Sequence, residues 1–180
     1  TVKRAVPAKI IRQIRDMDLS HDSSLEYARD LFMFSFYTRG MSFIDMAYLK
    51  KSNLQNGFLS YRRKKTNQQL VIKWEKPMQE IIDKYDTIGS SYLLPIILDA
   101  KTDERKQYKN AAQLVNSKLK KLGKQIGLPI PLTSYVARHA WASIARSKNI
   151  PLATISEAMG HGFRKHYTDL SCIVRHLRSG

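Results

Sequence analysis

The stretch of sequence that decides the fold is residues 133–162, TSYVARHAWASIARSKNIPLATISEAMGHG. Its capping residues and its internal proline predict two successive helices. The first helix carries an arginine-histidine pair, Arg138 and His139, among apolar residues, and a Gly-His turn at Gly160 and His161 follows about twenty residues later. Because a charged side chain is unexpected in an apolar sequence, we interpret Arg138 as a functional cation rather than as a surface arginine. His139 has a second interpretation, as a satisfied histidine of the core.

Hydrophobic spacing on either side of this stretch predicts a chain that is mostly α-helical, with one small antiparallel β-sheet. A turn at Asn56-Gly57 precedes two predicted strands, 58–63 and 69–74, which form a hairpin around a polar tip at 64–68. Further helices are expected in five places: after Pro7, at 25–37 behind an Asp22-Ser23-Ser24 cap, at 42–49, at 77–85 and at 103–123. The predicted fold class is therefore α+β.

The composition fits one basic domain. The chain has 180 residues, of which 43% are hydrophobic, and this is enough to bury a core. Its 31 Lys and Arg residues against 15 Asp and Glu residues give a net charge of +16, so nucleic acid is the simplest partner, although a generically basic protein would fit equally well. The single cysteine, Cys172, excludes an internal disulfide and suits a reducing compartment. No apolar run approaches the roughly 20 residues of a membrane helix.

The two motifs, Arg138-His139 and Gly160-His161, together resemble the second half of the active site of the tyrosine recombinases, the phage integrase family. The resemblance covers about residues 7–162. It implies the catalytic domain of a mobile-element integrase, with the DNA breaking-rejoining fold. The family's helical N-terminal domain, which clamps the other face of the DNA, would precede Thr1, so residues 1–180 would be the catalytic domain without it.

Breaking and rejoining a phosphodiester without a metal requires cations for the phosphorane, a general acid for the 5′-oxygen and a nucleophile. The resemblance implies that Arg39, Arg138 and His161 bind the phosphate. It also implies that Lys65, at the tip of the predicted hairpin, is the general acid. Tyr135 takes the position of the histidine in the family's second box, His-x-x-Arg.

The basic residues around the hairpin tip are expected to contact the DNA. They are Arg62, Arg63 and Lys64, with His139 as a further contact on the helix of Arg138. A lysine at a hairpin tip is more often simply solvated, and Lys64 is the neighbour most easily confused with Lys65.

Two residues compete for the role of the family's first arginine. In the family this arginine stands three residues before an acidic residue on a short helix. Here Asp45 is the acidic residue, but Ser42 occupies the arginine's spacing, and Arg39 lies about one helical turn earlier. We assign the role to Arg39, with Arg63 as the alternative.

The sequence after Gly162, FRKHYTDLSCIVRHLRS, reads as a poor helix and does not continue the resemblance. The family's nucleophilic tyrosine stands about nine residues after the Gly-His histidine, where this chain has Leu170. Read one base further along, codons for this tail can encode SENTTRIYLASLDTSEV, whose tyrosine overlaps the Leu170 codon. We therefore predict a single-base frameshift near the Gly162 codon, in the genome or in the clone, so that 163–180 is a shifted tail. The alternative is a genuine tail in which Tyr167, six residues after His161, is a displaced nucleophile.

The predicted function is site-specific DNA recombination or integration through a 3′-phosphotyrosyl intermediate, with the written chain cleaving poorly or not at all. The alternatives are a type IB topoisomerase, which would relax DNA without a specific site, and a DNA-binding protein without chemistry. The expected partner is double-stranded DNA, bound in the bacterial cytoplasm by a monomer that assembles into a tetramer during recombination. No membrane association and no cofactor are expected. No metal is expected either, because Cys172 and the histidines near it fit no zinc pattern.

Overall fold

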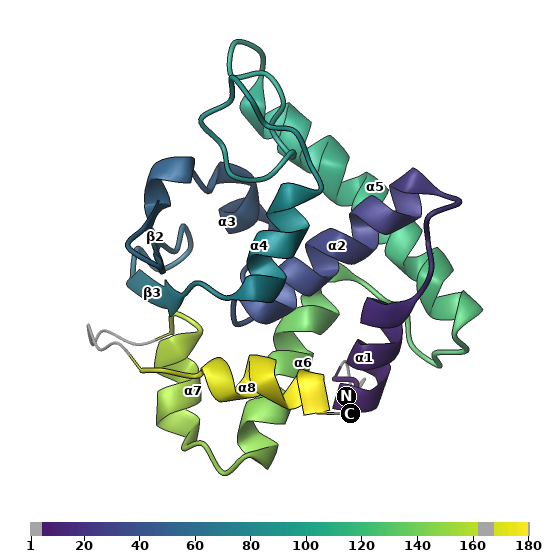
Figure 1. Cartoon of the computed structure of the whole chain (residues 1–180), viewed down its shortest axis with the longest axis vertical. Coiled ribbons are helices and arrows are strands. Elements are labelled where there is room, and N and C mark those ends of the chain that lie inside the picture. The colour runs from purple at the N-terminus through teal and green to yellow at the C-terminus, as the bar shows by residue number, and fades with distance from the viewer. Residues whose placement is uncertain (1–4, 162–167, 180) are drawn as a thin grey trace.

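The fold is a helical body with a small sheet at one edge (Figure 1). The computed structural model of the chain describes residues 5–161 and 168–179. Within these ranges, no helix is both long enough and apolar enough to cross a lipid bilayer. The predicted fold class, mostly α-helical with a small antiparallel sheet, is confirmed.

The helix α2 (Ser23–Tyr37) runs through the middle of the molecule (Figure 1). Four helices pack against it: α1 (Ala8–Asp16), α4 (Lys76–Asp83), α5 (Glu104–Gln125) and α6 (Ser134–Ser147). Every residue of 28–37 is buried. Because neighbours cover α2 from several directions, it carries apolar residues around its circumference rather than along one stripe.

The start of α2 follows the predicted cap. The Oδ1 atom of Asp22 accepts hydrogen bonds from the backbone N–H groups of Ser24, at 3.1 Å, and Leu25, at 3.2 Å. These bonds satisfy two of the N–H groups that a helix leaves without a partner at its first turn. The sequence therefore fixes where the central helix begins.

The sheet has three antiparallel strands in the order β1-β2-β3: β1 (Leu54–Gln55), β2 (Phe58–Arg62) and β3 (Gln69–Lys73). Positive φ angles at Asn56 and Gly57, 53° and 79°, form the predicted turn between β1 and β2. The β2–β3 hairpin is confirmed, whereas the sequence did not predict β1. A strand of two residues is too short to show the alternation by which strands are recognised.

The other predicted helices are also present. The short helices α3 (Phe43–Tyr48) and α7 (Leu152–Ala158) lie where they were expected, and α5 extends slightly beyond its predicted end at Gly123. A Cβ atom on Gly123 would lie 3.0 Å from the Cβ atom of Leu132, so this glycine serves close packing inside the helix rather than ending it.

From Ser171 onward the described part of the C-terminal tail is helical, and the expectation of a poor helix is wrong there. It forms α8 (Ser171–His176) and a 3-10 turn, η2 (Leu177–Ser179), which pack against α6 and α1 respectively. The tail buries four apolar side chains at the spacing of one helix face: Leu170, Ile173, Val174 and Leu177. This spacing is visible in the sequence and is typical of an amphipathic helix.

Candidate active site

Arg138, on α6, joins three separate segments of the chain. The residue is 7% exposed. Its Nη1 donates to the carbonyl of Gly40 at 3.0 Å, and its Nη2 donates to the carbonyl of Met159 at 2.8 Å. Nη2 also lies 2.9 Å from Nε2 of His161. A guanidinium has only donors, so Nε2 of His161 is the acceptor and the ring proton of the neutral histidine is on Nδ1.

The turn after α2 lets Arg138 come this close. The backbone N–H of Gly40 donates to the carbonyl of Ser35 at 2.7 Å, and that of Arg39 donates to the carbonyl of Phe36 at 3.3 Å. These two bonds form a Schellman motif. A Cβ atom on Gly40 would lie 2.4 Å from the Cα atom of Arg138, so only glycine permits this approach of α6.

Arg39 occupies the position of the Schellman motif that is usually glycine. Its φ angle is 67°, a left-handed conformation that costs a residue with a side chain about 1 kcal/mol. Arg39 is 7% exposed, and its Nη2 donates to the carbonyl of Thr168 at 2.8 Å. Leu170 lines a small cavity together with Arg39. A strained residue with a buried cation points to a functional role, because the surrounding structure must hold it there.

Ser42 and Asp45 support the hairpin rather than supplying a cation. The hydroxyl of Ser42 donates to Oδ2 of Asp45 at 2.8 Å, and Oδ1 of Asp45 accepts the backbone N–H of Lys64 at 3.0 Å. The acidic residue of α3 therefore fixes the start of the hairpin tip. The serine at the spacing of the family's first arginine orients that acidic residue.

Arg63 is a third buried arginine and lies at the end of β2. It is 6% exposed, and its Nη1 donates to the carbonyl of Gly160 at 3.3 Å. A Cβ atom on Gly160 would lie 2.7 Å from Cδ of Arg63. The alternative first arginine is therefore also part of the cluster around Arg138 and His161, rather than a surface contact of the hairpin.

The two hairpin-tip lysines differ in what they contact. The Nζ atom of Lys64 lies 4.1 Å from the ring centroid of Tyr48, a cation–π contact on the side of α3. Lys65 is exposed, and its charge is one of those that lower the pKa of His161. Their surroundings therefore differ: Lys64 lies over Tyr48 of α3, whereas Lys65 adjoins Thr66, whose hydroxyl donates to the carbonyl of Gly160 in the Gly-His turn.

The cluster is strongly positive, and the pKa shifts record this. Burial is the first cause of the lowered pKa of His161, followed by the charges of Arg138, Arg63 and Lys65. Burial likewise lowers the pKa of Arg138, and the charge of Arg63 adds to this effect. Cations that repel one another in a partly buried site are stabilised when an anion such as a phosphate binds among them.

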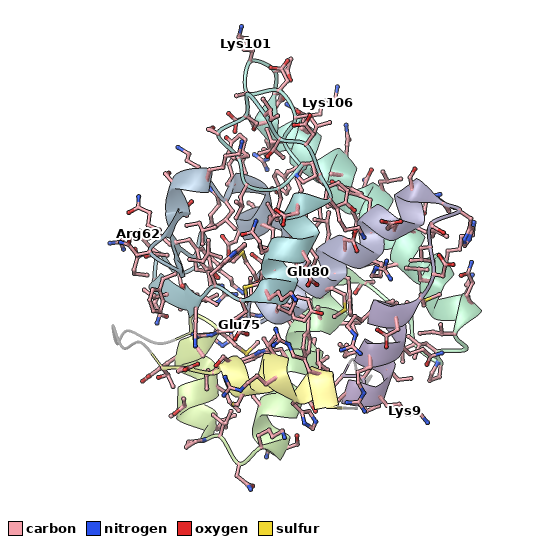
Figure 2. All side chains as sticks on the ribbon, in the orientation of Figure 1. Lys9, Arg62, Glu75, Glu80, Lys101 and Lys106 are labelled. Carbon is pink, nitrogen blue, oxygen red and sulfur yellow. The ribbon has the colours of Figure 1, made fainter. Side chains whose placement is uncertain are left out.

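Tyr135, His139 and Arg62 lie around this cluster rather than inside it. Tyr135 is 52% exposed, and its ring meets that of His139 edge-on at a centroid distance of 4.8 Å. Tyr135 precedes Arg138 by one helical turn of α6, so its exposed phenol lies beside the arginine. Figure 2 shows Arg62 pointing outward from the sheet, and its Nη1 donates to the carbonyl of Asn67 at 3.1 Å.

The nucleophile has two candidate positions, and the structure describes only one of them. Leu170, where the family's tyrosine was expected, is 7% exposed and directly precedes α8. Tyr167, the displaced alternative, lies outside the described residues, as does Phe163, where the predicted frameshift begins. His166 is also outside them, and the described part of the chain contains no group of three or more metal-binding side chains.

Sequence reasoning missed four residues that build the site: Gly40, Tyr61, Thr66 and Gln68. Tyr61 follows the inward alternation of β2, and burial raises the pKa of its phenol, with the charge of Asp45 as the next cause. The glycine had a local signal, because a glycine after a helix is a common cap. Thr66 and Gln68 had no local signal, since both contact the end of α7, far away in the sequence.

Comparison with known proteins agrees with this architecture. No protein-family model matches the sequence, and no curated protein sequence matches it. The crystal structure of XerA recombinase superposes with a TM-score of 0.55 and 16% identity, over 96% of this chain and 60% of that one. The crystal structure of a lambda integrase(75-356) dimer bound to a COC′ core site superposes with a TM-score of 0.57 and 15% identity, over 98% of this chain and 60% of that one.

At these identities the likeness establishes the fold. The chain has the fold of a tyrosine recombinase catalytic domain, and the resemblance in the sequence is confirmed at that level. The chain spans 60% of the length of each of the two structures.

Proposed function

We propose that this chain is the catalytic domain of a site-specific DNA recombinase of the integrase type, which cuts and rejoins DNA through a 3′-phosphotyrosyl intermediate. One observation carries the proposal: the Arg138 guanidinium lies 2.9 Å from His161, beside the buried Arg63 on Gly160, and it binds the carbonyl of Gly40, which follows the buried Arg39. On a recombinase fold, such a cluster suits the extra negative charge of a phosphorane.

The contacts of Arg138 leave it able to bind phosphate. Three of the five N–H donors of its guanidinium are engaged by Gly40, Met159 and His161, which leaves two for phosphate oxygens. The engaged donors orient the group before the substrate arrives. The Nδ1–H of His161 provides a further donor in the same place.

The chemistry needs neither a metal nor ATP. The tyrosine, having lost its phenol proton to water, attacks the scissile phosphorus, and the bond from phosphorus to the 5′-oxygen breaks as Lys65 gives that oxygen a proton. In the second step, the 5′-hydroxyl of a partner strand attacks the phosphotyrosine and gives its proton to Lys65, and the tyrosine leaves as a phenolate. Each step exchanges one phosphodiester for another, so the bond energy is retained.

The proposal also includes the origin of the nucleophilic tyrosine. A tyrosine encoded across the Leu170 codon would enter the chain beside Arg39, because Leu170 and Arg39 line one cavity. This supports a frameshift and a written chain that lacks its nucleophile. The burial of Ile173 and Leu177 favours the rival, a genuine tail with Tyr167 as the nucleophile. Sequencing the coding DNA of the genome and of the clone over residues 160–180 decides between them.

The proposed partner is double-stranded DNA, with four copies of the chain assembled on it during recombination in a bacterial cytoplasm. The net charge of +16 and the DNA-bound state of the lambda integrase structure support the choice of DNA. Binding should weaken steeply as the salt concentration rises.

The test is covalent capture. The written protein and a version recoded with the hidden-frame tail are each incubated with a random duplex library, and complexes that survive denaturing detergent are sequenced. The recoded protein should form complexes at a preferred sequence. Phenylalanine in place of its recoded tyrosine should abolish them, as should Arg138→Ala.

Three outcomes oppose the proposal or part of it. DNA binding without capture by either protein would support the non-catalytic alternative. Capture without sequence preference, together with plasmid relaxation, would support a topoisomerase. Capture by the written protein that is lost in Tyr167→Phe would remove the frameshift and keep the recombinase.

A further inference from the structure

The tip of the β2–β3 hairpin is tied to the Gly-His turn through one carbonyl oxygen. The hydroxyl of Thr66 donates to the carbonyl of Gly160 at 2.8 Å, and Nη1 of Arg63 donates to the same oxygen at 3.3 Å. The two donors use both lone pairs of that oxygen. A weaker contact, 3.5 Å from Nε2 of Gln68 to the carbonyl of Glu157, lies beside them.

Two properties of Gly160 make this attachment possible. Gly160 has a φ angle of 84°, which turns the chain at the end of α7. Its missing side chain leaves room for Arg63, whose Cδ atom would lie 2.7 Å from a Cβ atom at this position. The hairpin therefore packs directly on the backbone of the turn.

The attachment joins the neighbours of two proposed catalytic residues. Thr66 follows Lys65 in the sequence, and Gly160 precedes His161. We propose that Thr66 is a positioning residue: its hydroxyl, bonded to the Gly160 carbonyl, holds the exposed Lys65 beside His161, so that both reach one scissile phosphate. The inference rests on the proposed function of Lys65 and His161, and nothing in the fold comparison assigns a role to Thr66.

The remaining contacts of the tip do not replace this bond. The backbone N–H of Lys64 is held by Asp45, and the backbone N–H of Asn67 donates to the carbonyl of Arg63 at 2.7 Å. These bonds shape the hairpin, but neither joins it to the Gly-His turn. Loss of the Thr66 hydroxyl should therefore leave the hairpin folded and loosen its attachment, since Arg63 alone would hold the carbonyl.

The first experiment needs no catalysis. The pKa of the His161 imidazole is measured by NMR titration of the full written chain, with its signal assigned from His161→Gln. Burial and the cations Arg138, Arg63 and Lys65 lower this pKa. Lys65→Met should raise it, because one cation is removed. Thr66→Val should also raise the pKa of His161, because Lys65 moves away. Thr66→Ser keeps the hydroxyl and should leave this pKa unchanged.

The double variant Lys65→Met with Thr66→Val should give the same pKa as Lys65→Met alone, because Thr66 acts through the lysine. The proposal is overturned if Thr66→Val leaves the pKa of His161 unchanged. The proposal is also overturned if Lys65→Met leaves the pKa of His161 unchanged, since Lys65 would then not lie beside the histidine.

A second experiment measures the acid step in whichever tail version cleaves DNA. One substrate has the normal bridging 5′-oxygen, and the other has sulfur there, which leaves as a thiolate without needing a proton. Thr66→Val should slow cleavage of the oxygen substrate about tenfold, a fraction of what a general acid contributes. The sulfur substrate should be cut at nearly the unsubstituted rate, and Thr66→Ser should restore the oxygen rate.

Equal slowing of both substrates would show that Thr66 is only structural, while the proposed recombinase activity would stand. Failure of every version to cleave would remove the proposed function. The NMR titration would still decide whether Thr66 fixes the distance between Lys65 and His161.

Discussion

The cationic cluster and the described part of the C-terminal tail both contain buried side chains, but different contacts hold them. In the cluster, Arg138 and Arg63 donate hydrogen bonds to the carbonyls of Gly40, Met159 and Gly160, from segments far apart in the sequence. The tail is held mainly by apolar side chains of α8 and η2. Directional bonds require particular residues, whereas an apolar pocket accepts many sequences of similar volume. The hydrogen bonds of the cluster are therefore strong support for a functional role of its residues. The burial of apolar side chains is weak support for the view that the written tail is genuine.

The largest expected effect tests whether the tail is part of the folded core. Ile173→Ala should lower the free energy of unfolding by about 2–5 kcal/mol, because Ile173 is fully buried. Ile144→Ala in α6 is the matched reference, and urea unfolding of the written chain measures both. If Ile173→Ala has no effect while Ile144→Ala destabilises, the tail does not contribute to the fold, and the frameshift is favoured.

The next effect tests the close approach of α6 to the turn after α2. Gly40→Ala should lower the free energy of unfolding by roughly 2–4 kcal/mol, because the new Cβ atom would overlap Arg138 and because φ is 73° there. Gly57→Ala is the control, since its φ angle is 79° but no atom lies within 4 Å of its Cβ position. Equal losses in the two variants would mean that backbone strain alone matters and that the approach to Arg138 does not.

A smaller effect separates the two hairpin lysines. Lys65→Ala should slow DNA cleavage about 100-fold, as expected for loss of a general acid. Lys64→Ala removes an ammonium that lies over Tyr48 and should leave the cleavage rate close to that of the parent. Single-turnover cleavage at saturating protein concentration makes the comparison independent of binding. A larger loss in Lys64→Ala than in Lys65→Ala would reverse the assignment.

The smallest effect is a pH dependence of stability. The pKa of folded His161 lies below its ordinary value of 6.5, so the unfolded state binds a proton more readily. This histidine therefore costs no stability above about pH 6.5, and its cost grows as the pH falls from that value toward the folded pKa. The stability lost between about pH 7.5 and pH 5.5 should be smaller in His161→Gln than in the parent protein. Identical losses in the two proteins would mean that the cluster does not repel a charged His161.

Much of the site could be predicted from local patterns. Arg138 and His161 were found because an arginine among apolar residues and a Gly-His turn after a helix are visible within a short window. The hairpin that carries Lys65 was found from its turn and its strand composition. Arg63 was recognised as an alternative but not as a buried member of the cluster, because its burial depends on Gly160, which is remote in the sequence.

For the C-terminal tail, the prediction was wrong although a local pattern was present in the sequence. The apolar spacing of Leu170, Ile173, Val174 and Leu177 predicts a helix by the same rule that located α1 and α6. The codons of the tail can encode the family's tyrosine in a shifted frame. The written frame encodes an amphipathic helix, and neither fact excludes the other.

The sequence by itself determined the mostly helical class, the cap of α2, the hairpin, the basic charge and the two motifs around Arg138 and His161. These features depend on residues within a few turns of one another, so spacing along the chain reveals them. Only the tertiary structure decided that Lys64 lies over Tyr48, that Arg39 is buried in a left-handed conformation and that Thr66 reaches Gly160. Those facts depend on contacts between residues 94 and 129 positions apart, as for Thr66 with Gly160 and Arg39 with Thr168. Such contacts form only when packing brings separate elements together, and no local pattern of residues encodes them.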